Sequence, residues 1–369
     1  MAKKIYLIIS LLTVITAQTC GFITGPEDSQ LHLLWKKELP VESTIAFPSG
    51  IAIDGNTLYF ADDYSKMYMI NTDGSGFKEA HLPNGSTFGV PVIWGNLVVV
   101  GTSNAGPIVR YAGIYAFNKL TLETMWAKTH FIWTGVPAID EMYVYATDLD
   151  KVYAFDKTSG RQVWSQTIFG KNVYNPVIEG GRLYFATGSI FKRDGYLYCL
   201  DKYNGEIVFQ DTLPYMPDRS QFGGSPAGVE IWRDYVYVPA DNRNLYCFNK
   251  HTGALVWKFL ADAPMETPPR LSEGIVYTGS LNRTVYAINA KTGVPLWSYQ
   301  ARASIGSNAP QFYKNYVLLE DQNILIFDKK SGKLIVKGGS AFSAVWNMDG
   351  QIFAGGYKGD KSYIFAYQF

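Results

Sequence analysis

The sequence predicts an all-β fold assembled from repeated four-stranded units, and three observations lead to this prediction. The chain of 369 residues is 15% aromatic and holds 35 glycines, a composition that suits pleated strands joined by tight turns. Only 18% of its residues are charged, against roughly 25% in an average soluble domain. One short phrase, Tyr-Ala-Phe-Asp or a variant of it, recurs eight times. A repeat of this kind determines the architecture, because each copy needs its neighbours to bury its apolar surface.

Each copy of the phrase lies in a similar sequence context. In five units a glycine stands four residues after the final Asp or Asn, as at Gly160 and Gly293. A large side chain, most often tryptophan, stands eight residues after the same Asp or Asn. We expect these side chains to pack between neighbouring units. Successive copies are 38 to 48 residues apart. The copies end at Asn71, Asn118, Asp156, Asp201, Asn249, Asn289, Asp328 and Gln368, and the tryptophans are Trp126, Trp164, Trp257 and Trp297.

Each unit is predicted to contain four short strands in a fixed order. The first opens with a proline, as in Val90-Pro91-Val92, where the missing N–H costs no ladder hydrogen bond. A second apolar strand follows, for example residues 97–100, and the repeated phrase is the third. Asp-Lys-x-x-Gly then forms the hairpin to the fourth strand, because Asp or Asn caps the turn and Gly supplies a positive φ. Such units are propeller blades, so we expect an eight-bladed β-propeller of four-stranded antiparallel blades.

The two ends of the chain are expected to close the ring together. The last unit, residues 344–369, has its first three strands and then the chain stops. Residues 33–39 have the form of a missing fourth strand and include a tryptophan, Trp35. We therefore expect the N-terminal strand to complete the last blade, which makes residues 31–369 a single domain with short, protected sheet edges.

The spacing of these residues resembles a known repeat. Ala154-x-Asp156-x-x-x-Gly160-x-x-x-Trp164 is similar to the tryptophan-docking repeat of the PQQ-type, or quinoprotein-like, β-propellers. The resemblance covers nearly the whole chain after the N-terminal segment. Three units depart from the pattern: Asn71 ends a faint copy, Leu122 stands in the glycine place, and Val336 stands in the tryptophan place.

In length, leader and blade count the chain is most similar to the lipoprotein propeller of the outer-membrane β-barrel assembly machinery. That resemblance implies a non-enzymatic scaffold that binds a protein partner, with an outer-membrane barrel-assembly complex as the expected partner. No motif allows the partner-contacting residues of that protein to be carried over to this chain. The expectation therefore concerns architecture, and one fold hosts many functions.

The N-terminal residues have the pattern of an export signal. Lys3 and Lys4 precede an apolar run over residues 5–15, which is too short to span a bilayer, and small residues follow it. We predict a signal peptide at 1–19, lipidation at Cys20 and a polar tether over 20–30. This places the protein as a lipoprotein at the periplasmic face of the outer membrane or in the cell envelope. The alternative is cleavage after Ala17, which leaves Cys20 as a free thiol in a soluble periplasmic or secreted protein.

Charge and cysteine content exclude several classes of function. With 33 basic and 32 acidic residues the chain lacks the net positive charge of a nucleic-acid binder. Its three cysteines and four histidines are scattered, without a CxxC pair, so neither a metal site nor a disulfide framework is expected. Cys199 and Cys247 occupy the alanine place of adjacent copies, where a small buried residue is the favoured interpretation and a redox pair the alternative.

Recognition is expected where the units differ, in three expanded loops. These are residues 102–113, residues 188–195 and the blade-to-blade link 211–224. Aromatic side chains beside arginine are typical of recognition surfaces, whereas the alternative is that insertions drift freely and carry ordinary solvated charge. The candidate contact residues are Arg110, Tyr111, Phe191, Lys192, Arg193, Tyr215, Arg219 and Phe222.

No catalytic residue, metal ligand or cofactor is predicted. The sequence contains no GxSxG, HExxH or phosphate-binding loop placed before a helix. Two alternatives to the scaffold stay open: a small-molecule or carbohydrate-binding propeller, and an enzyme like the PQQ-dependent dehydrogenases of the family, which hold PQQ and calcium in the channel. Many of those enzymes carry two adjacent cysteines, which this chain lacks.

Overall fold

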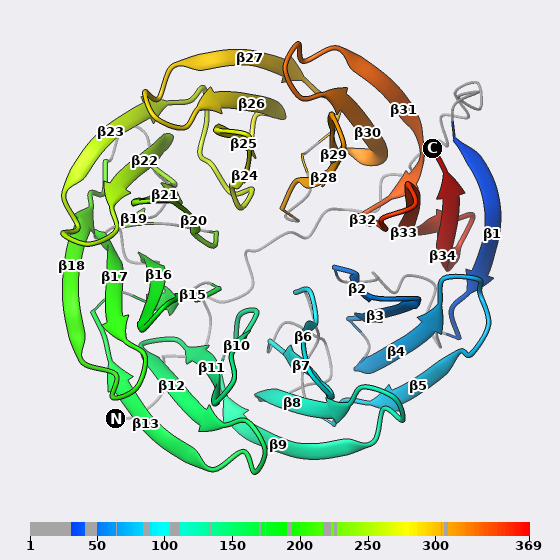
Figure 1. The fold of residues 1–369 in the computed structure, drawn as a ribbon, viewed down its shortest axis with the longest axis horizontal. Helices are drawn as coiled ribbons and strands as arrows, with labels where there is room; N and C mark the ends of the chain where they lie inside the picture. Colours follow the sequence, from blue (N-terminus) through cyan, green and yellow to red (C-terminus); the bar gives the residue numbers. More distant parts are fainter. Residues whose placement is uncertain are drawn as a thin grey trace, which may run out of the picture.

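The computed structural model confirms an all-β propeller of eight four-stranded antiparallel blades (Figure 1). It describes residues 31–40, 50–63, 65–83, 89–103, 111–132, 134–169, 171–173, 175–189, 194–216, 223–224, 227–303, 305 and 309–369. The predicted signal peptide and tether lie outside these residues. In each blade the first strand lies nearest the ring axis and the fourth forms the outer wall (Figure 1).

Blades 1 to 4 follow the predicted strand order, with β14 and β19 added in blade 4, and the first strands of blades 2 to 4 begin just after prolines. Val92, Ala138 and Val177 are the first residues of β6, β10 and β15, because proline cannot donate the ladder hydrogen bond. Blade 1 contains β2 (Ala52–Asp54), β3 (Thr57–Ala61), β4 (Lys66–Asn71) and β5 (Lys78–His81), and blade 2 contains β6 (Val92–Trp94), β7 (Leu97–Gly101), β8 (Ala112–Asn118) and β9 (Thr124–Phe131). Blade 3 contains β10 (Ala138–Ile139), β11 (Tyr143–Asp148), β12 (Lys151–Asp156) and β13 (Gln162–Thr167), and blade 4 contains β14 (Lys171–Val173), β15 (Val177–Glu179), β16 (Arg182–Ser189), β17 (Gly195–Asp201), β18 (Ile207–Leu213) and β19 (Gly223–Gly224).

Blades 5 to 8 repeat the same order, and the last blade takes its outer strand from the N-terminus. Blade 5 contains β20 (Glu230–Trp232), β21 (Tyr235–Pro239), β22 (Asn244–Asn249) and β23 (Leu255–Leu260), and blade 6 contains β24 (Arg270–Ser272), β25 (Ile275–Gly279), β26 (Thr284–Asn289) and β27 (Pro295–Gln300). Blade 7 contains β28 (Gln311–Tyr313), β29 (Tyr316–Glu320), β30 (Gln322–Asp328) and β31 (Leu334–Ala341), and blade 8 contains β32 (Ser343–Trp346), β33 (Gln351–Lys358), β34 (Lys361–Gln368) and β1 (His32–Glu38).

The ring closes as the sequence predicts. β1 pairs antiparallel with β34, from His32 opposite Gln368 to Glu38 opposite Tyr363. The end of the strand is fixed by an ion pair in which Lys361 Nζ lies 2.7 Å from Glu38 Oε1. The N-terminal strand therefore completes blade 8, and the first and last described strands depend on each other.

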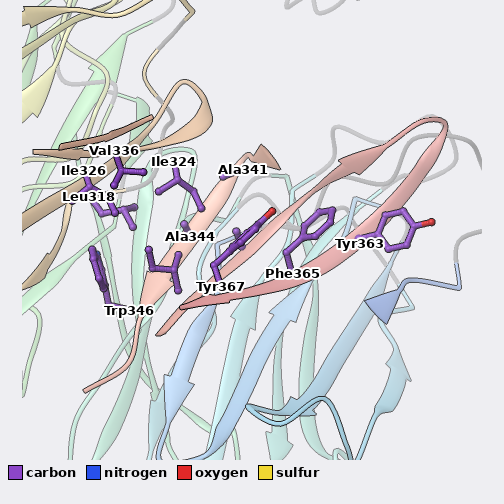
Figure 2. Close-up of a cluster of buried hydrophobic side chains, with 12 residues drawn as sticks. Leu318, Ile324, Ile326, Val336, Ala341, Ala344, Trp346, Tyr363, Phe365 and Tyr367 are labelled. Carbon is purple, nitrogen blue, oxygen red and sulfur yellow. The ribbon is translucent and has the colours of Figure 1, made fainter. Parts of the chain in front are cut away.

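The apolar core lies between blades rather than within them. Figure 2 shows one such cluster, in which Leu318 and Ile326 of blade 7 pack against Ala344, Trp346 and Phe365 of blade 8. The other clusters likewise combine side chains of successive blades. Because each blade buries its faces only against its neighbours, no single blade has a core of its own.

The tryptophans of the fourth strands hydrogen-bond to the next blade along the ring. Each indole Nε1 donates to the main-chain carbonyl of the residue that follows the terminal Asp or Asn of the next unit. One indole group therefore both fills an inter-blade gap and satisfies a turn carbonyl. The bonds are Trp35 to Thr72 (2.9 Å), Trp126 to Lys157 (2.8 Å), Trp164 to Lys202 (3.0 Å), Trp257 to Ala290 (3.1 Å) and Trp297 to Lys329 (2.9 Å).

The turn glycines are required by this docking. Gly293 has φ +72°, and a Cβ placed there would lie 2.7 Å from the ring of Trp257. At the one position where leucine replaces glycine, Leu122 adopts φ +60°. The fourth strand of the preceding blade, β5, contains no tryptophan that could pack against this turn. Glycine is therefore needed for space as well as for its backbone conformation.

Two further contacts join neighbouring blades at the same turns. Tyr237 Oη donates to the carbonyl of Ala290 and Tyr277 Oη to that of Lys329, each at 3.0 Å. Both tyrosines belong to second strands, and both carbonyls also accept the tryptophan bonds. In addition, lysines that follow the terminal Asp or Asn form ion pairs with acids of the preceding blade. The pairs are Lys119 with Asp54 (2.6 Å), Lys202 with Asp140 (2.8 Å), Lys250 with Glu179 (2.9 Å) and Lys329 with Glu273 (3.0 Å).

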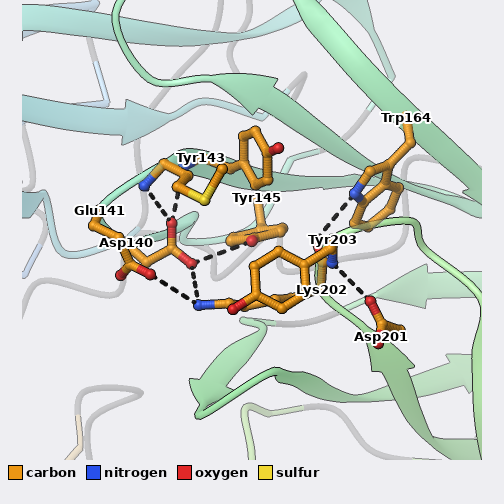
Figure 3. Close-up of polar contacts among 9 residues, drawn as sticks. Asp140, Glu141, Tyr143, Tyr145, Trp164, Asp201, Lys202 and Tyr203 are labelled. Carbon is orange, nitrogen blue, oxygen red and sulfur yellow. Dashed lines mark hydrogen bonds and ion pairs between the residues drawn. The ribbon is translucent and has the colours of Figure 1, made fainter.

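The pair between Lys202 and Asp140 is the most buried of these (Figure 3). Asp140 also accepts hydrogen bonds from Tyr145 Oη at 3.2 Å and from the main-chain N of Met142 and Tyr143 at 2.8 Å. Burial opposes ionisation of Asp140, but the bonds from Lys202 and from these amides outweigh it and keep its pKa below the usual value. The carboxylate is therefore charged at neutral pH and fully hydrogen-bonded, as a buried ion must be to persist.

We expect Gly293→Ala to destabilise the protein far more than Gly180→Ala. Gly180 also has a positive φ, +57°, but nothing lies within 4 Å of a Cβ added there. The backbone strain shared by both variants is about 1–2 kcal/mol, and the collision with Trp257 adds roughly 1–3 kcal/mol at residue 293. Denaturant titration of both variants measures the difference, and equal losses would show that docking does not govern the turn.

We expect deletion of residues 31–39 to abolish the cooperative thermal transition. The deletion removes a whole strand and the Trp35 contact, and leaves β34 as an open edge. Circular dichroism and calorimetry of the deleted chain make the measurement. A chain lacking residues 21–29 is the control and should melt like the parent; a sharp, unshifted transition in the 31–39 deletion would contradict the closure.

Candidate functional site

The strand order divides the propeller into two faces. Because the strands of each blade are antiparallel, the links from second to third strands and from blade to blade share one face, called here the loop face. The hairpins from first to second and from third to fourth strands share the other, called here the turn face. All three expanded loops of the sequence belong to the loop face, whereas the docking glycines belong to the turn face.

Blade 4 differs from the other blades on the loop face. Its second strand, β16, continues beyond its pairing with β17, and Gly188 is partnered by both Lys171 of β14 and Gly224 of β19. β14 comes from the link that enters the blade and β19 from the link that leaves it. The resulting six-stranded sheet is called here the blade-4 extension, and it joins three segments that are separate in the sequence.

Hydrogen bonds tie the two expanded loops of this blade together. The main-chain N of Tyr215 donates to Asp194 Oδ1 at 2.7 Å, which links the loop over 188–195 to the link over 211–224. Asn242 Nδ2 of blade 5 donates to the carbonyl of Pro214 at 2.7 Å. The described ends of the two insertions, at Asp194 and Tyr215, are therefore joined.

Hydrogen bonds close the base of the expanded loop of blade 2. The main-chain N of Gly113 donates to Thr102 Oγ1 at 2.8 Å, and the main-chain N of Thr102 donates to the carbonyl of Gly113 at 2.9 Å. Next to Gly113, Tyr111 is 48% exposed, and its ring lies 5.3 Å from that of His130. Blade 3 separates this loop from the blade-4 extension (Figure 1).

Two of the candidate recognition residues belong to the described part of the chain. Tyr111 lies at the edge of the blade-2 loop, and Tyr215 lies two residues after β18, in the link that leaves blade 4. The remaining candidates, Arg110, Phe191, Lys192, Arg193, Arg219 and Phe222, and the predicted lipidation residue Cys20, lie outside the described residues.

Two carboxyl groups near the inner strands of blades 5 and 6 have perturbed pKa values. Burial raises the pKa of Glu230, although Arg270 Nε lies 3.5 Å from its Oε1 and opposes the rise. Burial also raises the pKa of Glu266, and the nearby Asp241 adds to the effect. Single acids are too common in the sequence to be singled out, so only their position in the ring identifies them. Among the described residues no group of three or more His, Cys, Asp or Glu side chains could hold a metal ion.

The two internal cysteines are free thiols buried in blades 4 and 5. Burial raises the pKa of Cys199 to about 11 and that of Cys247 to about 12. At neutral pH both side chains are therefore thiols rather than reactive thiolates.

A buried carboxyl group lies at the junction of blades 7 and 8. Glu320 is 2% exposed, and its Oε1 accepts a hydrogen bond from the main-chain N of Ala344 at 2.7 Å. Burial raises its pKa to about 8, with the Ala344 bond opposing the rise. The adjacent Asp321 is paired with Lys337 at 2.9 Å.

We expect the free energy of unfolding to fall as the pH rises from about 4.5 to about 8, because of Glu320. The unfolded chain ionises this group near 4.5, whereas the folded chain retains the proton up to about 8. The folded state therefore binds more protons in this window, and stability is lost as pH rises through it. Glu320→Gln keeps the neutral shape, so the variant should gain stability over the parent increasingly towards pH 8; a constant difference across the window would contradict the assignment.

The closed ring of four-stranded sheets and the docking of tryptophan on turn glycines define an eight-bladed β-propeller of the PQQ-like repeat class. A family model described as outer membrane protein assembly factor BamB matches residues 110–222 and 193–349. The chain belongs to this family, which confirms the resemblance drawn from its repeats.

Solved structures and a curated protein are similar to the chain. BamB from Moraxella catarrhalis superimposes with a TM-score of 0.65 at 16% identity, over 92% of this chain and 98% of that one. A europium-containing methanol dehydrogenase superimposes with a TM-score of 0.73 at 11% identity, over 92% of this chain and 94% of that one. Tetrathionate hydrolase of Acidithiobacillus ferrooxidans is 26% identical over 239 residues, which are 56% of this chain and 46% of the hydrolase. The chain thus spans about half the length of that relative.

The solved structures and the family model support different conclusions about the chain. At 16% and 11% identity the two solved structures show a shared fold and nothing about chemistry. The family match covers residues 110–349, from β8 of blade 2 to β32 of blade 8, and so includes the blade-4 extension. Within the part of the chain that the structure describes, no helix is long and apolar enough to cross a membrane.

Proposed function

We propose that the protein is a non-enzymatic scaffold of the cell envelope, exported and held at the periplasmic face of the outer membrane by a lipid on Cys20. Its function is to bind a protein partner through the loop face, and the expected partner is an outer-membrane barrel-assembly complex. The observation that carries the proposal is the blade-4 extension, where backbone pairing holds two expanded loops on an otherwise regular ring. Membership of the BamB family supports the choice of partner.

Backbone pairing in blade 4 suits protein recognition for a physical reason. β14 and β19 are already held on β16, so these segments lose less conformational entropy when a partner docks. Tyr215 follows β18 in the link that leaves the blade, and the sequence of this link and of residues 188–195 is rich in aromatic and arginine residues, the residue types that contribute most at protein interfaces.

We expect purified protein to recover barrel-assembly subunits from solubilised outer membranes, and Tyr215→Ser to weaken this recovery. Truncation of an aromatic hot spot should lower the affinity by at least about tenfold. Tyr203→Ser is the matched control, since Tyr203 is an exposed tyrosine on the turn face. Immunoblots for named assembly subunits make the measurement. Equal recovery by both variants would exclude the blade-4 extension as the binding site, and no recovery by the parent would exclude the partner.

The lipid anchor is tested separately. Labelled palmitate should be incorporated by the parent and not by Cys20→Ala, and globomycin should block processing of the precursor. An unlabelled, normally exported parent would support the soluble alternative, with cleavage after Ala17.

An enzymatic function is the second candidate, because the curated relative is named a tetrathionate hydrolase and a dehydrogenase shares the fold. Under the scaffold proposal, PQQ with calcium should produce neither a chromophore nor a thermal shift, and tetrathionate should not be consumed. A clear signal in either assay would favour the enzyme, and a shift with sugars alone would favour the carbohydrate-binding alternative.

A further inference from the structure

The outer wall of blades 5, 6 and 7 has an unusual charge distribution. Residues 249–260, 289–300 and 328–341 contain the third-to-fourth turns and fourth strands of these blades, each from its terminal Asn or Asp, and Asp328 is the one acid in them. They carry seven lysines, of which four, Lys258, Lys291, Lys330 and Lys333, are exposed. The corresponding segments of blades 1 and 4, residues 71–81 and 201–213, instead contain more acids than lysines. Positive charge is therefore concentrated on one arc of a nearly neutral protein.

Apolar side chains are exposed on the same arc. Leu255 and Val256 at the start of β23 are 50% and 47% exposed, and Val294 and Leu296 at the start of β27 are 57% and 48% exposed. Alternate residues of a strand point to the same side, so Val256 stands beside Lys258 on the exposed side of β23. The eight residues, four lysines and four apolar side chains, are called here the basic rim.

Tryptophan docking makes the basic rim continuous. Trp257 of β23 packs on the turn glycine of blade 6, Gly293, and Trp297 of β27 packs on that of blade 7, Gly332. The turns that carry Lys291, Lys330 and Lys333 are thus held next to the preceding outer strand. In Figure 1, β23, β27 and β31 follow one another along one arc of the ring.

We propose that the basic rim binds an anionic lipid surface directly, apart from any lipid anchor. Lysines near an anionic bilayer gain about 1 kcal/mol each, and interspersed apolar side chains can enter the headgroup region. In these segments lysines outnumber acids by seven to one, and Glu273 on the turn face is paired with Lys329, so repulsion from an anionic surface is small. The rim lies along the outer wall and the turn face, so this contact leaves the blade-4 extension on the loop face accessible to a protein partner.

Vesicle flotation of the full chain tests the proposal. The parent should float with vesicles of phosphatidylcholine mixed with phosphatidylglycerol, much less with phosphatidylcholine alone, and less as salt is added. A rim variant, Lys258→Glu with Lys291→Glu and Lys330→Glu, should partition at least about tenfold more weakly. Since all proteins compared carry the same first 30 residues, the leader cannot cause the difference.

The matched control reverses the same number of charges across the ring. Lys128→Glu with Lys151→Glu and Arg161→Glu changes blades 2 and 3, which lie across the ring from the rim (Figure 1), and charges separated by more than a Debye length of about 10 Å are largely screened. This control should lose no more than about twofold in partitioning. Thermal melts of both variants verify that each is folded.

Three results would overturn the proposal. The first is a rim variant that floats like the parent. The second is a control variant whose partitioning to vesicles falls as much as that of the rim variant, and the third is a parent that does not bind vesicles containing anionic lipid. Serine at both Val294 and Leu296 should weaken the binding that persists at high salt, which a purely ionic contact would not show. If the parent instead formed a dimer in sedimentation that the rim variant abolished, without vesicle binding, the rim would be an interface between copies.

Discussion

The docking of a tryptophan on the turn glycine of the next blade is the interaction on which the rest of the structure depends. The indole of Trp297, for example, packs against Gly332 and donates to the carbonyl of Lys329 at 2.9 Å. The left-handed glycine brings the turn close enough for this contact, and the contact sets the angle between blades. A hydrogen bond of this kind contributes only about 0.5–1.5 kcal/mol, but it recurs around the ring and is cooperative with the inter-blade cores. At blade 2, where the preceding strand supplies no tryptophan, leucine replaces glycine.

The same turns collect further inter-blade contacts, which make the turn face rigid. The carbonyls of Ala290 and Lys329 each accept bonds from a tryptophan and a tyrosine, and the side chain of Lys329 reaches Glu273 of the preceding blade. Exposed ion pairs contribute little by themselves, whereas the pair of Lys202 with Asp140 is buried and fully hydrogen-bonded. The geometry of the ring is therefore maintained on one face, which leaves the loop face free to vary.

The inter-blade contacts are concentrated on the turn face, and this explains where the two proposed surfaces lie. The blade-4 extension uses links that the framework does not need, so insertions there leave the docking intact. The basic rim uses exposed positions of turns and outer strands, so charge and apolar surface can accumulate there without affecting the fold. The two surfaces begin on the adjacent blades 4 and 5, and the apolar core between these blades fixes their relative orientation.

The sequence by itself determined the number of blades, the strand order, the hairpin turns and the closure by β1, because these follow from a local pattern repeated eight times. Only the tertiary structure decided which groups meet across blades. Tyr237 and Ala290 are 53 residues apart, and no local signal links them. β14 and β19 pair through backbone atoms, which leave no side-chain pattern to detect. The burial of Glu320 and the continuity of the basic rim likewise depend on neighbouring blades. The repeat specifies the strands and turns of each blade locally. The contacts between blades, the burial of side chains such as Glu320 and the gathering of lysines into one surface arise only when the ring brings distant units together.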